Sequence, residues 1–416
     1  MESQALITND AVVLGMLLAM LAFVFTTHSS QSKFWKRFYS IIPSVFVCYF
    51  LPSLFATLSI IDGEASNLYF VASRYLLPTS LVLLTISVDI PGILRLGPKA
   101  LIMFFTGTVG ILIGGPVALL IVGTIAPEAV GGEGPAAVWR GLTTVAGSWI
   151  GGGANQAAMK EVFDVSDDLF SSMIAVDVVI ANIWMAILLF LVGRAKRIDA
   201  WLGADTSAID QLRERVEKHE RAHARIPTLT DIMQILAVGF GVTAASHFLA
   251  DLIAPAIESA APGLAVYNLT SKFFWLVVLA TTAALVLSYT RVRTIEHAGA
   301  SRIGSACLYV LVATIGMRMN LGAVLDRPML FVIGGVWMAV HAMLMLGVAK
   351  AIKAPVFFMA VGSQANVGGA ASAPIIASAV HPALAPVGAL LAVLGYAIGT
   401  YGAYLCGQIM RVVASG

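Results

Sequence analysis

The sequence predicts an all-α polytopic membrane protein with about ten transmembrane helices and two polar breaks, arranged as an inverted repeat. The first observation is composition: 59% of the 416 residues are hydrophobic, 12% are charged, and the mean hydropathy is +0.89. A soluble domain carries about 25% charged residues, so a soluble enzyme is excluded. The second is a series of long apolar runs, and the third is a pair of similar polar stretches, one in each half.

The apolar runs are long enough to cross a bilayer as helices. The ten predicted spans cover residues 11–27, 38–61, 74–94, 98–125, 168–193, 230–253, 273–290, 301–325, 328–351 and 384–410. The two polar stretches precede the fifth and the tenth span. Each half of the chain therefore contains five spans and one polar break.

Lys and Arg residues predict the orientation. They gather in the loops after the first, third, fifth, seventh and ninth spans, whereas the loops at 62–67 and 126–136 carry acids and no Lys or Arg. Cytoplasmic loops of membrane proteins are rich in Lys and Arg, so we expect a bacterial-type inner membrane protein with both termini outside. The basic central segment, residues 194–229, is then a cytoplasmic linker helix with mixed charges at 210–224.

The polar breaks lie at residues 143–164 and 354–380, with the sequences GSWIGGGANQ and GSQANVGGAAS at their centres. Glycine leaves peptide groups bare, and bare peptide groups at membrane depth occur only where protein buries them or a wet cavity surrounds them. The charge distribution favours re-entrant hairpins, the first dipping from outside and the second from the cytoplasm. A broken helix that crosses the bilayer is the alternative.

The breaks also suggest a duplication. The spacing from Gly92 to Pro98 equals that from Gly322 to Pro328. The dipeptide Gly147-Ser148 of the first break then corresponds to Gly362-Ser363 of the second. An odd number of spans in each half inverts the second copy, so we expect inverted repeats at 1–193 and 230–416. Chance similarity of Gly-rich membrane segments is the alternative.

The hairpin tips are the predicted substrate site, because half-helix N-termini attract carboxylates and amide side chains orient a ligand. Small residues used only for helix packing are the alternative, although packing does not explain the amides. The predicted residues are Ser148, Gly151, Gly152, Gly153, Asn155, Gln156, Ser363, Gln364, Asn366, Gly368, Gly369 and Ser372.

Charged residues inside the spans are the other candidates. Asp177 lies nine residues past Asp168, about 13 Å along a helix, and therefore near the middle of a ~30 Å hydrocarbon core. We expect Asp177 and Asn182 to bind a coupling ion, Na⁺ or H⁺, unless Asp177 is a structural carboxylate. Arg318 either receives an anionic substrate or extends to the outer surface near Asp326.

These motifs resemble a family. The segment GSWIGGGANQAAMKEVF, followed by AVDVVIANIWMAILLF and by GSQANVGGAASAP in the second half, is similar to the YjcL-like integral membrane proteins of unknown function. That family is distantly similar to sodium/glutamate symporters and cation–proton antiporters. The resemblance implies a mobile core beside a scaffold, working as an elevator, and a homodimer. It supplies no substrate, because the glutamate motif is not repeated residue for residue.

The combined expectation is an ion-coupled secondary transporter of a small anionic or zwitterionic organic solute, with membrane lipid as its surroundings and no nucleic-acid partner. A cation–proton antiporter without organic substrate is the alternative. No GxSxG motif and no phosphate-cradling loop occurs, so a membrane enzyme is disfavoured, and no cofactor other than a coupling Na⁺ is expected.

Overall fold

The computed structural model describes residues 5–204, 226–319 and 327–415, together with residues 206, 209 and 212. Within them the chain forms helices and turns, with one isolated β-bridge between Ile7 and Ile61. The start of the predicted linker is a helix, α10 (Ala195–Leu202). Its predicted charged part, 210–224, lies outside the described residues except for residue 212.

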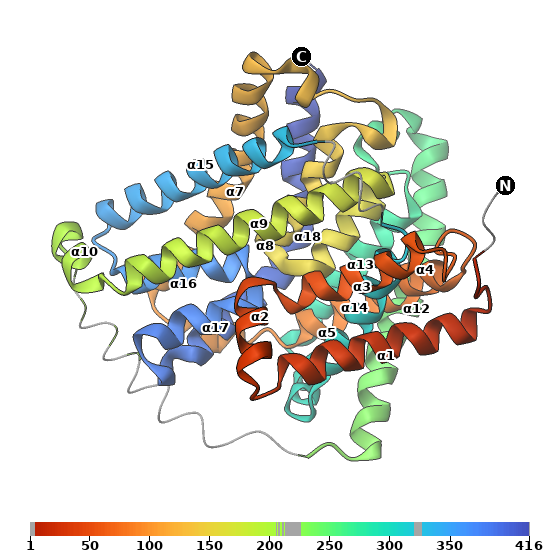
Figure 1. Ribbon diagram of the computed structural model, residues 1–416, viewed down its shortest axis with the longest axis horizontal. Helices are drawn as coiled ribbons and strands as arrows, with labels where there is room; N and C mark the ends of the chain where they lie inside the picture. The colour runs from red at the N-terminus through yellow and green to blue at the C-terminus, as the bar shows by residue number, and fades with distance from the viewer. Residues whose placement is uncertain are drawn as a thin grey trace.

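The helices form two bundles that pack mainly within themselves (Figure 1). The hairpin bundle, on the left and in the centre of the view, comprises α7 (Pro98–Ile125), α8 (Val138–Val162), α9 (Asp167–Val192), α15 (Met329–Ala351), α16 (Val356–Val367), α17 (Gly369–Val380) and α18 (Ala385–Ser415). The flanking bundle, on the right, comprises α1 (Asp10–His28), α3 (Ser44–Thr57), α4 (Leu68–Val71), α5 (Leu77–Ile86), α12 (Leu229–Ala260), α13 (Lys272–Ser288) and α14 (Ala300–Gly316).

Shorter elements connect these helices. They are α2 (Lys33–Ile41), α6 (Ile90–Leu94), the π-helical turn η1 (Ala72–Leu76), and the 3₁₀ turns η2 (Pro127–Ala129), η3 (Gly134–Ala136), η4 (Pro262–Tyr267), η5 (Arg291–Ala298) and η7 (Pro382–Leu384). The turn η1 continues α4 into α5, so these three elements form one long apolar run, Leu68–Ile86.

Seven runs of helix in the described residues are long and apolar enough to cross a membrane. Two further pairs, bent by 90° and 95°, raise the number to nine if each pair counts as one span. Large apolar side chains on α1, α7 and α12 are exposed, as lipid-facing helices require. The structure thus supports an integral membrane protein. The predicted spans 38–61, 273–290 and 301–325 correspond to the shorter helices α3, α13 and α14, and the count of ten stays a prediction.

The first polar break folds α8 back on itself. Gly152 has φ +75° and ψ −176°, which ends the first limb of the helix and starts the second. Arg140 near the beginning of α8 donates to the carbonyl of Phe163 after its end, at 2.5 Å, and the Phe163 ring contacts Trp139. In a straight helix these residues would lie about 34 Å apart. The fold-back predicted for 143–164 is therefore present.

The second break is a hairpin of α16 and α17 that meet at Gly368 and Gly369, where Gly369 has φ +57°. Lys353, before α16, accepts through its carbonyl from Lys99 at the start of α7. Ala373 of α17 packs against Gly388 near the start of α18. Because α7 and α18 run in the same direction, with Met410 beside Gly115, both limbs of this hairpin open toward the end of the bundle where α7 and α18 begin.

The two hairpins enter the bundle from opposite ends. Both limbs of α8 lie along α18, with Thr143 and Phe163 against Gly407 toward its far end and Gly151 against Gly399. The second hairpin lies beside the beginning of α18. Glycines along α18 thus allow two oppositely directed hairpins to pack closely against one continuous helix.

The helix α10 closes the base of the second hairpin. Asp199 accepts at 2.7 Å from the backbone N–H of Val356, the first residue of α16, and so caps that helix from a distant part of the chain. Burial raises the pKa of the Asp199 carboxyl, an effect that the Val356 hydrogen bond opposes. Lys350 donates to the carbonyl of Trp201 and stacks on its ring at 4.5 Å. The linker therefore begins by docking on this hairpin.

Replacing Gly399 with valine should destabilise the protein. A Cβ at Gly399 would lie 2.6 Å from the Cα of Gly151, backbone that cannot move aside without shifting the hairpin, so we expect a loss of about 1–3 kcal/mol or failure to fold. Tryptophan fluorescence during thermal unfolding in detergent measures the change. The matched control is Gly335→Val in α15, where nothing lies within 4 Å. Equal melting temperatures for both variants would contradict this packing.

Candidate functional site

The breaks of the two hairpins meet beside Gly395 of α18. The carbonyl oxygen of Ile150 in the first hairpin lies 2.6 Å from the position that a Cβ on Gly395 would occupy, and that of Ala365 in the second lies 3.7 Å from it. The absence of a side chain at residue 395 lets both backbones approach α18 at one level. The structure thus brings together two polar stretches that are far apart in the sequence.

The glycines of the predicted site serve two purposes. A Cβ on Gly151 would lie 2.3 Å from Asn155 Nδ2, and one on Gly368 would lie 1.8 Å from Ser372 Oγ, so these glycines permit close packing. In contrast, a Cβ on Gly369 would meet nothing within 4 Å, whereas one on Gly152 would meet the Tyr396 ring at 3.4 Å and one on Gly153 would meet Leu308 at 3.9 Å. Open space is therefore found at the second tip.

Asn155 fixes the first tip to α18. Its Nδ2 donates to the carbonyl of Gly151 at 2.9 Å and to that of Tyr396 at 3.5 Å. Its Oδ1 accepts from the Thr400 hydroxyl at 2.7 Å. Asn155 is fully buried, and these bonds use its hydrogen-bonding groups.

Asn366 fixes the second tip to α7 with the same pattern. Its Nδ2 donates to the carbonyls of Gly362 and Phe104, at 3.0 and 2.9 Å, and its Oδ1 accepts from Thr108 at 2.8 Å. Each asparagine therefore donates to the carbonyl of a glycine four residues earlier in its own limb. Each also accepts from the hydroxyl of a threonine on a neighbouring helix and donates to the carbonyl of the residue four positions before that threonine. This pattern matches Gly151 to Gly362, a different register from the pairing of Gly147 with Gly362 in the sequence.

Asp177 of α9 joins both limbs of the first hairpin. It accepts from Trp149 Nε1 at 2.7 Å and from Gln156 Nε2 at 2.9 Å, and the Ser148 hydroxyl is a further partner. Asp177 is 8% exposed, and none of the ion pairs among the described residues includes it. A buried carboxylate with neutral donors alone carries a charge that a cation or a proton would compensate.

Two predicted residues lie away from this carboxylate. Asn182 is half-buried and donates at 2.6 Å to the carbonyl of Val178 in its own helix, and no observed contact links it to Asp177. Arg318 lies just after α14 and forms an ion pair with Asp167 at 2.9 Å. The surface position predicted for it beside Asp326 is outside the described residues, since residues 320–326 are not described.

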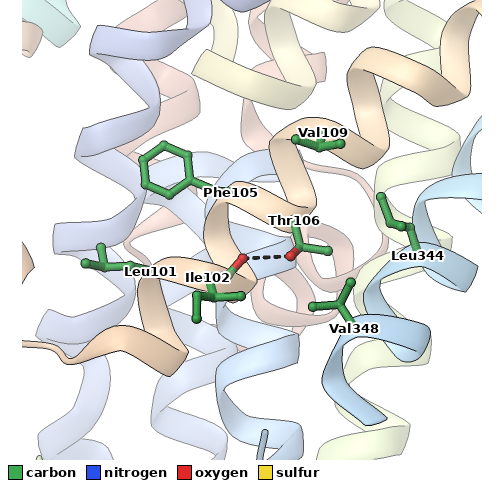
Figure 2. Close-up of a pocket in the computed structure, with 7 residues that line it drawn as sticks. All are labelled: Leu101, Ile102, Phe105, Thr106, Val109, Leu344 and Val348. Atoms are coloured by element: carbon green, nitrogen blue, oxygen red, sulfur yellow. Dashed lines mark hydrogen bonds between the residues drawn. The ribbon is translucent and has the colours of Figure 1, made fainter. Parts of the chain in front are cut away.

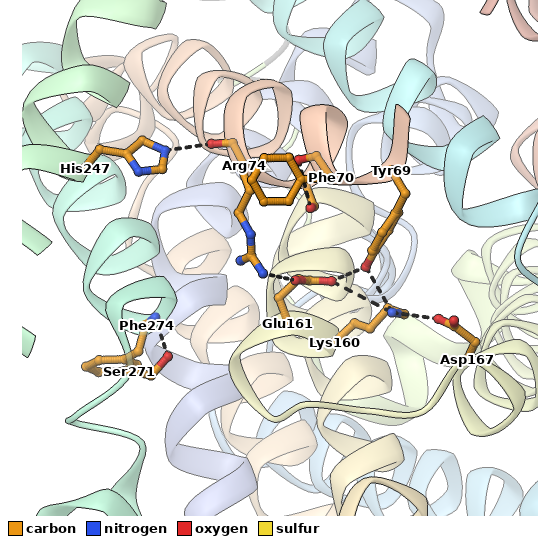
Figure 3. Close-up of polar contacts among 10 residues, drawn as sticks. Tyr69, Phe70, Arg74, Lys160, Glu161, Asp167, His247, Ser271 and Phe274 are labelled. Atoms are coloured by element: carbon orange, nitrogen blue, oxygen red, sulfur yellow. Dashed lines mark hydrogen bonds and ion pairs between the residues drawn. The ribbon is translucent and has the colours of Figure 1, made fainter. Parts of the chain in front are cut away.

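Arg318 belongs to a charge cluster that joins the two bundles. Figure 3 shows the part of this cluster formed by Tyr69, Arg74, Lys160, Glu161 and Asp167. Lys160, at the end of α8, lies 2.8 Å from Asp167 and donates to the Tyr69 hydroxyl at 2.9 Å. Glu161 pairs with Arg74 at 3.2 Å and accepts from the same tyrosine. Tyr69 and Arg74 come from α4 and η1, so the cluster ties the returning limb of the first hairpin to the flanking bundle.

Ser363 is held by a chain of hydrogen bonds. Trp184 Nε1 donates to its hydroxyl at 2.8 Å, and His341 Nε2 lies 2.7 Å from it. His341 Nδ1 faces the carbonyl of Gly107 at 3.1 Å. In a neutral imidazole Nδ1 therefore carries the proton and Nε2 accepts from Ser363. This predicted substrate residue is thus fully partnered.

Gln364 and Ser372 face each other across the second break, with Gln364 Nε2 2.7 Å from the Ser372 hydroxyl. Gln364 is 1% exposed, and its Oε1 has no hydrogen-bond partner. Gln364 is the one predicted hairpin residue, among those described, with a buried side-chain atom left unpartnered.

A groove between α7 and α15 is apolar and faces outward (Figure 2). Its walls are Leu101, Ile102, Phe105, Thr106, Val109, Leu344 and Val348. The Thr106 hydroxyl donates to the carbonyl of Ile102 in the same helix at 2.7 Å, so it is not free for a polar solute. The apolar lining of this groove suits a lipid chain.

The family model described as "Protein of unknown function (DUF819)" matches residues 15–413. The chain belongs to this family. The match covers both bundles and both hairpins, which agrees with the resemblance drawn from the hairpin motifs. No curated protein sequence matches the chain. Membership in the DUF819 family leaves the activity open, so the function has to be inferred from the site.

Several residues of this DUF819 site carry no signal that distinguishes them in the sequence. Thr108 and Thr400 are ordinary small residues of apolar helices, and only their contacts with the asparagines give them a role. Lys160 and Glu161, a charged pair directly after a polar break, are a detectable signal for the cluster. The described part of the chain contains no group of three or more His, Cys, Asp or Glu side chains that could hold a metal ion.

Replacing Lys160 with methionine should lower stability sharply. The variant leaves Asp167 and Glu161 in a mostly buried cluster with one cation fewer, and breaking a buried ion pair costs about 3–5 kcal/mol. The matched control is Lys272→Met, which removes a 2.8 Å ion pair with Asp251 whose side chains are 62% and 60% exposed. Surface pairs contribute about 0–1 kcal/mol. Thermal unfolding of both variants measures the two losses of stability. Equal losses would contradict the argument that the burial of the Lys160 ion pairs makes them costly to break.

Proposed function

We propose that the protein is an ion-coupled secondary transporter that moves a small anionic or zwitterionic organic solute across the membrane by alternating access. The observation that carries the proposal is the meeting of two oppositely directed hairpins beside Gly395. Secondary transporters bind their substrates where discontinuous helices of two repeats face each other near the middle of the bilayer. The meeting of the two hairpin breaks beside one residue of α18 supports such an arrangement here.

In this proposal the chain is an inverted repeat, and the hairpins are re-entrant. Irregular backbone within a bilayer requires protein or water around it, and the packing of both hairpins on α18 and α7 supplies the protein side. The open space at Gly369 supplies room for a ligand at the second tip.

The division into two bundles that pack mainly within themselves supports an elevator mechanism. The hairpin bundle contains both breaks and Asp177, and would move as the transport unit against the flanking bundle. The ion pairs of Arg318 with Asp167 and of Arg74 with Glu161 would then lock one end of the travel, because both cross between the bundles. The basic ends at Lys99, Lys350 and α10 favour a cytoplasmic location for the second hairpin's base in a bacterial-type inner membrane.

Asp177 is the proposed site of the coupling ion. A proton would neutralise the carboxylate directly. The residues also suit Na⁺, which takes oxygen ligands: the Asp177 carboxylate, the Ser148 hydroxyl and, after rotation of its amide, the Gln156 oxygen would hold it. Ion binding there would reorganise both limbs of the first hairpin, because Trp149 and Gln156 now bond the same carboxylate.

The experiment uses the whole chain in proteoliposomes on a solid-supported membrane. Currents are recorded on jumps of small carboxylates and amino acids, with and without Na⁺ and at two pH values. Solute currents that depend on the ion support the proposal. A pH change on addition of Na⁺ or K⁺ with no solute present would instead establish the cation–proton antiporter.

Replacing Asp177 with asparagine should abolish ion-dependent current while the protein stays folded. Asparagine keeps one acceptor for the Trp149 N–H but removes the charge that attracts the ion. The matched control is Asp168→Asn on the same helix, where the side chain is exposed. Melting curves check folding of both variants. Full ion-dependent current in folded Asp177→Asn would remove Asp177 from the mechanism.

A further inference from the structure

The N-terminus of α17 lies at the second break without a side-chain cap. The helix has 12 residues, begins at Gly369, and its N-cap residue, Gly368, offers no side chain. The first N–H groups of a helix have no partner within it and carry the positive end of its dipole. A Cβ at Gly369 would meet nothing within 4 Å, so the approach to these groups is open.

Gln364 adds a buried amide that points into the same break. Its Nε2 would lie 2.2 Å from a Cβ on Gly368, the residue that precedes α17. The amide faces Ser372 with one polar atom, and its other polar atom has no partner. If the amide is rotated by 180°, Ser372 donates to Oε1 and Nε2 becomes the free group, so either orientation leaves one atom unsatisfied.

An unsatisfied buried amide costs free energy, about 1–3 kcal/mol. The neighbouring polar residues of the hairpin do not share this cost, because Ser363 and Asn366 are fully partnered. The unsatisfied group therefore marks one place in the hairpin where a ligand would complete the hydrogen bonding.

The chemistry of the break favours an anion over a cation. Residues 356–380 contain no Asp or Glu that would repel a negative charge. Of the carbonyls near the end of α16, that of Gln364 accepts from the Gly368 N–H. The first N–H groups of α17 have no partner within their helix, and the rotated Gln364 amide adds another donor beside them.

We propose that the N-terminus of α17, together with Gln364 and Ser372, binds a carboxylate group of the transported solute. The inference rests on the proposed function and names the chemical group that the second hairpin recognises. One carboxylate oxygen accepts from the backbone N–H groups of the first turn of α17, and the other accepts from Gln364 Nε2. Ser372 holds the amide in that orientation by donating to Oε1.

The test measures thermal stabilisation of the whole chain in nanodiscs by matched neutral and anionic probes. The pairs are acetate and acetamide, succinate and succinamide, malate and malamide, and benzoate and benzamide. We expect at least one carboxylate to raise the melting temperature, as a ligand of the folded state does, and its amide to leave it unchanged. Gln364→Leu should weaken the apparent affinity for that carboxylate on the order of tenfold, the effect of losing a hydrogen bond to a charged group.

The matched control is Gln408→Leu in α18, which removes another amide with an unpartnered oxygen, remote from the break. Carboxylate affinity should be unchanged in this variant. Ser372→Ala is a second test if Gln364→Leu does not fold, and it should also weaken carboxylate binding. The proposal is overturned if no carboxylate stabilises the wild type, if amides stabilise equally, or if the variants bind as the wild type does.

Failure of this site and failure of the proposed function give different results. A carboxylate that binds through Gln364 but, as a labelled solute, is not taken up into proteoliposomes would contradict transport and leave the site intact. A neutral or cationic solute carried at full rate by Gln364→Leu would contradict the site and leave transport intact.

Discussion

The need to satisfy broken backbone inside an apolar bundle shapes this molecule. Each hairpin interrupts the helical ladder, and an unpaired peptide group in such surroundings costs several kcal/mol. Asn155 and Asn366 meet this need by the same means, bonding a glycine of their own limb and a threonine on a neighbouring helix. The glycines at 151, 362, 395 and 399 let the chains come close enough for these bonds.

The polar residues divide into those that hold the hairpins and those that remain available. Asn155, Asn366 and Ser363 are committed to contacts within the protein, so they act as positioning residues. Asp177 and Gln364 differ, because one carries an uncompensated charge and the other an unsatisfied atom. Each lies in or beside a different hairpin. In the proposed mechanism these two residues would hold the ion and the solute separately, while both act on the same pair of tips.

The sequence is sufficient to predict the membrane class and both hairpins, because glycine clusters with amides have no role in a lipid-facing helix. It also identifies Asp177 as a candidate, because its distance along the helix from Asp168 predicts a position near the middle of the hydrocarbon core. The partners of these residues cannot be predicted, since Thr108, Trp184 and Thr400 look like any residue of an apolar helix. Arg318 shows the same limit: its ion pair with Asp167 depends on where the end of α14 lies relative to the start of α9. The number of spans stays a prediction because α3, α13 and α14 are too short to assign by length alone.

The opposed entry of the hairpins is the central claim, and cysteine labelling in oriented vesicles tests it most directly. Asp164→Cys lies just after the first hairpin and Ala379→Cys near the end of the second, and both positions are exposed. Wild-type labelling gives the background, since Cys48 and Cys406 are buried and Cys307 is half-buried. A membrane-impermeant maleimide should label the Asp164→Cys variant from the outside and the Ala379→Cys variant from the cytoplasm. Labelling of both variants from the same side would contradict the account.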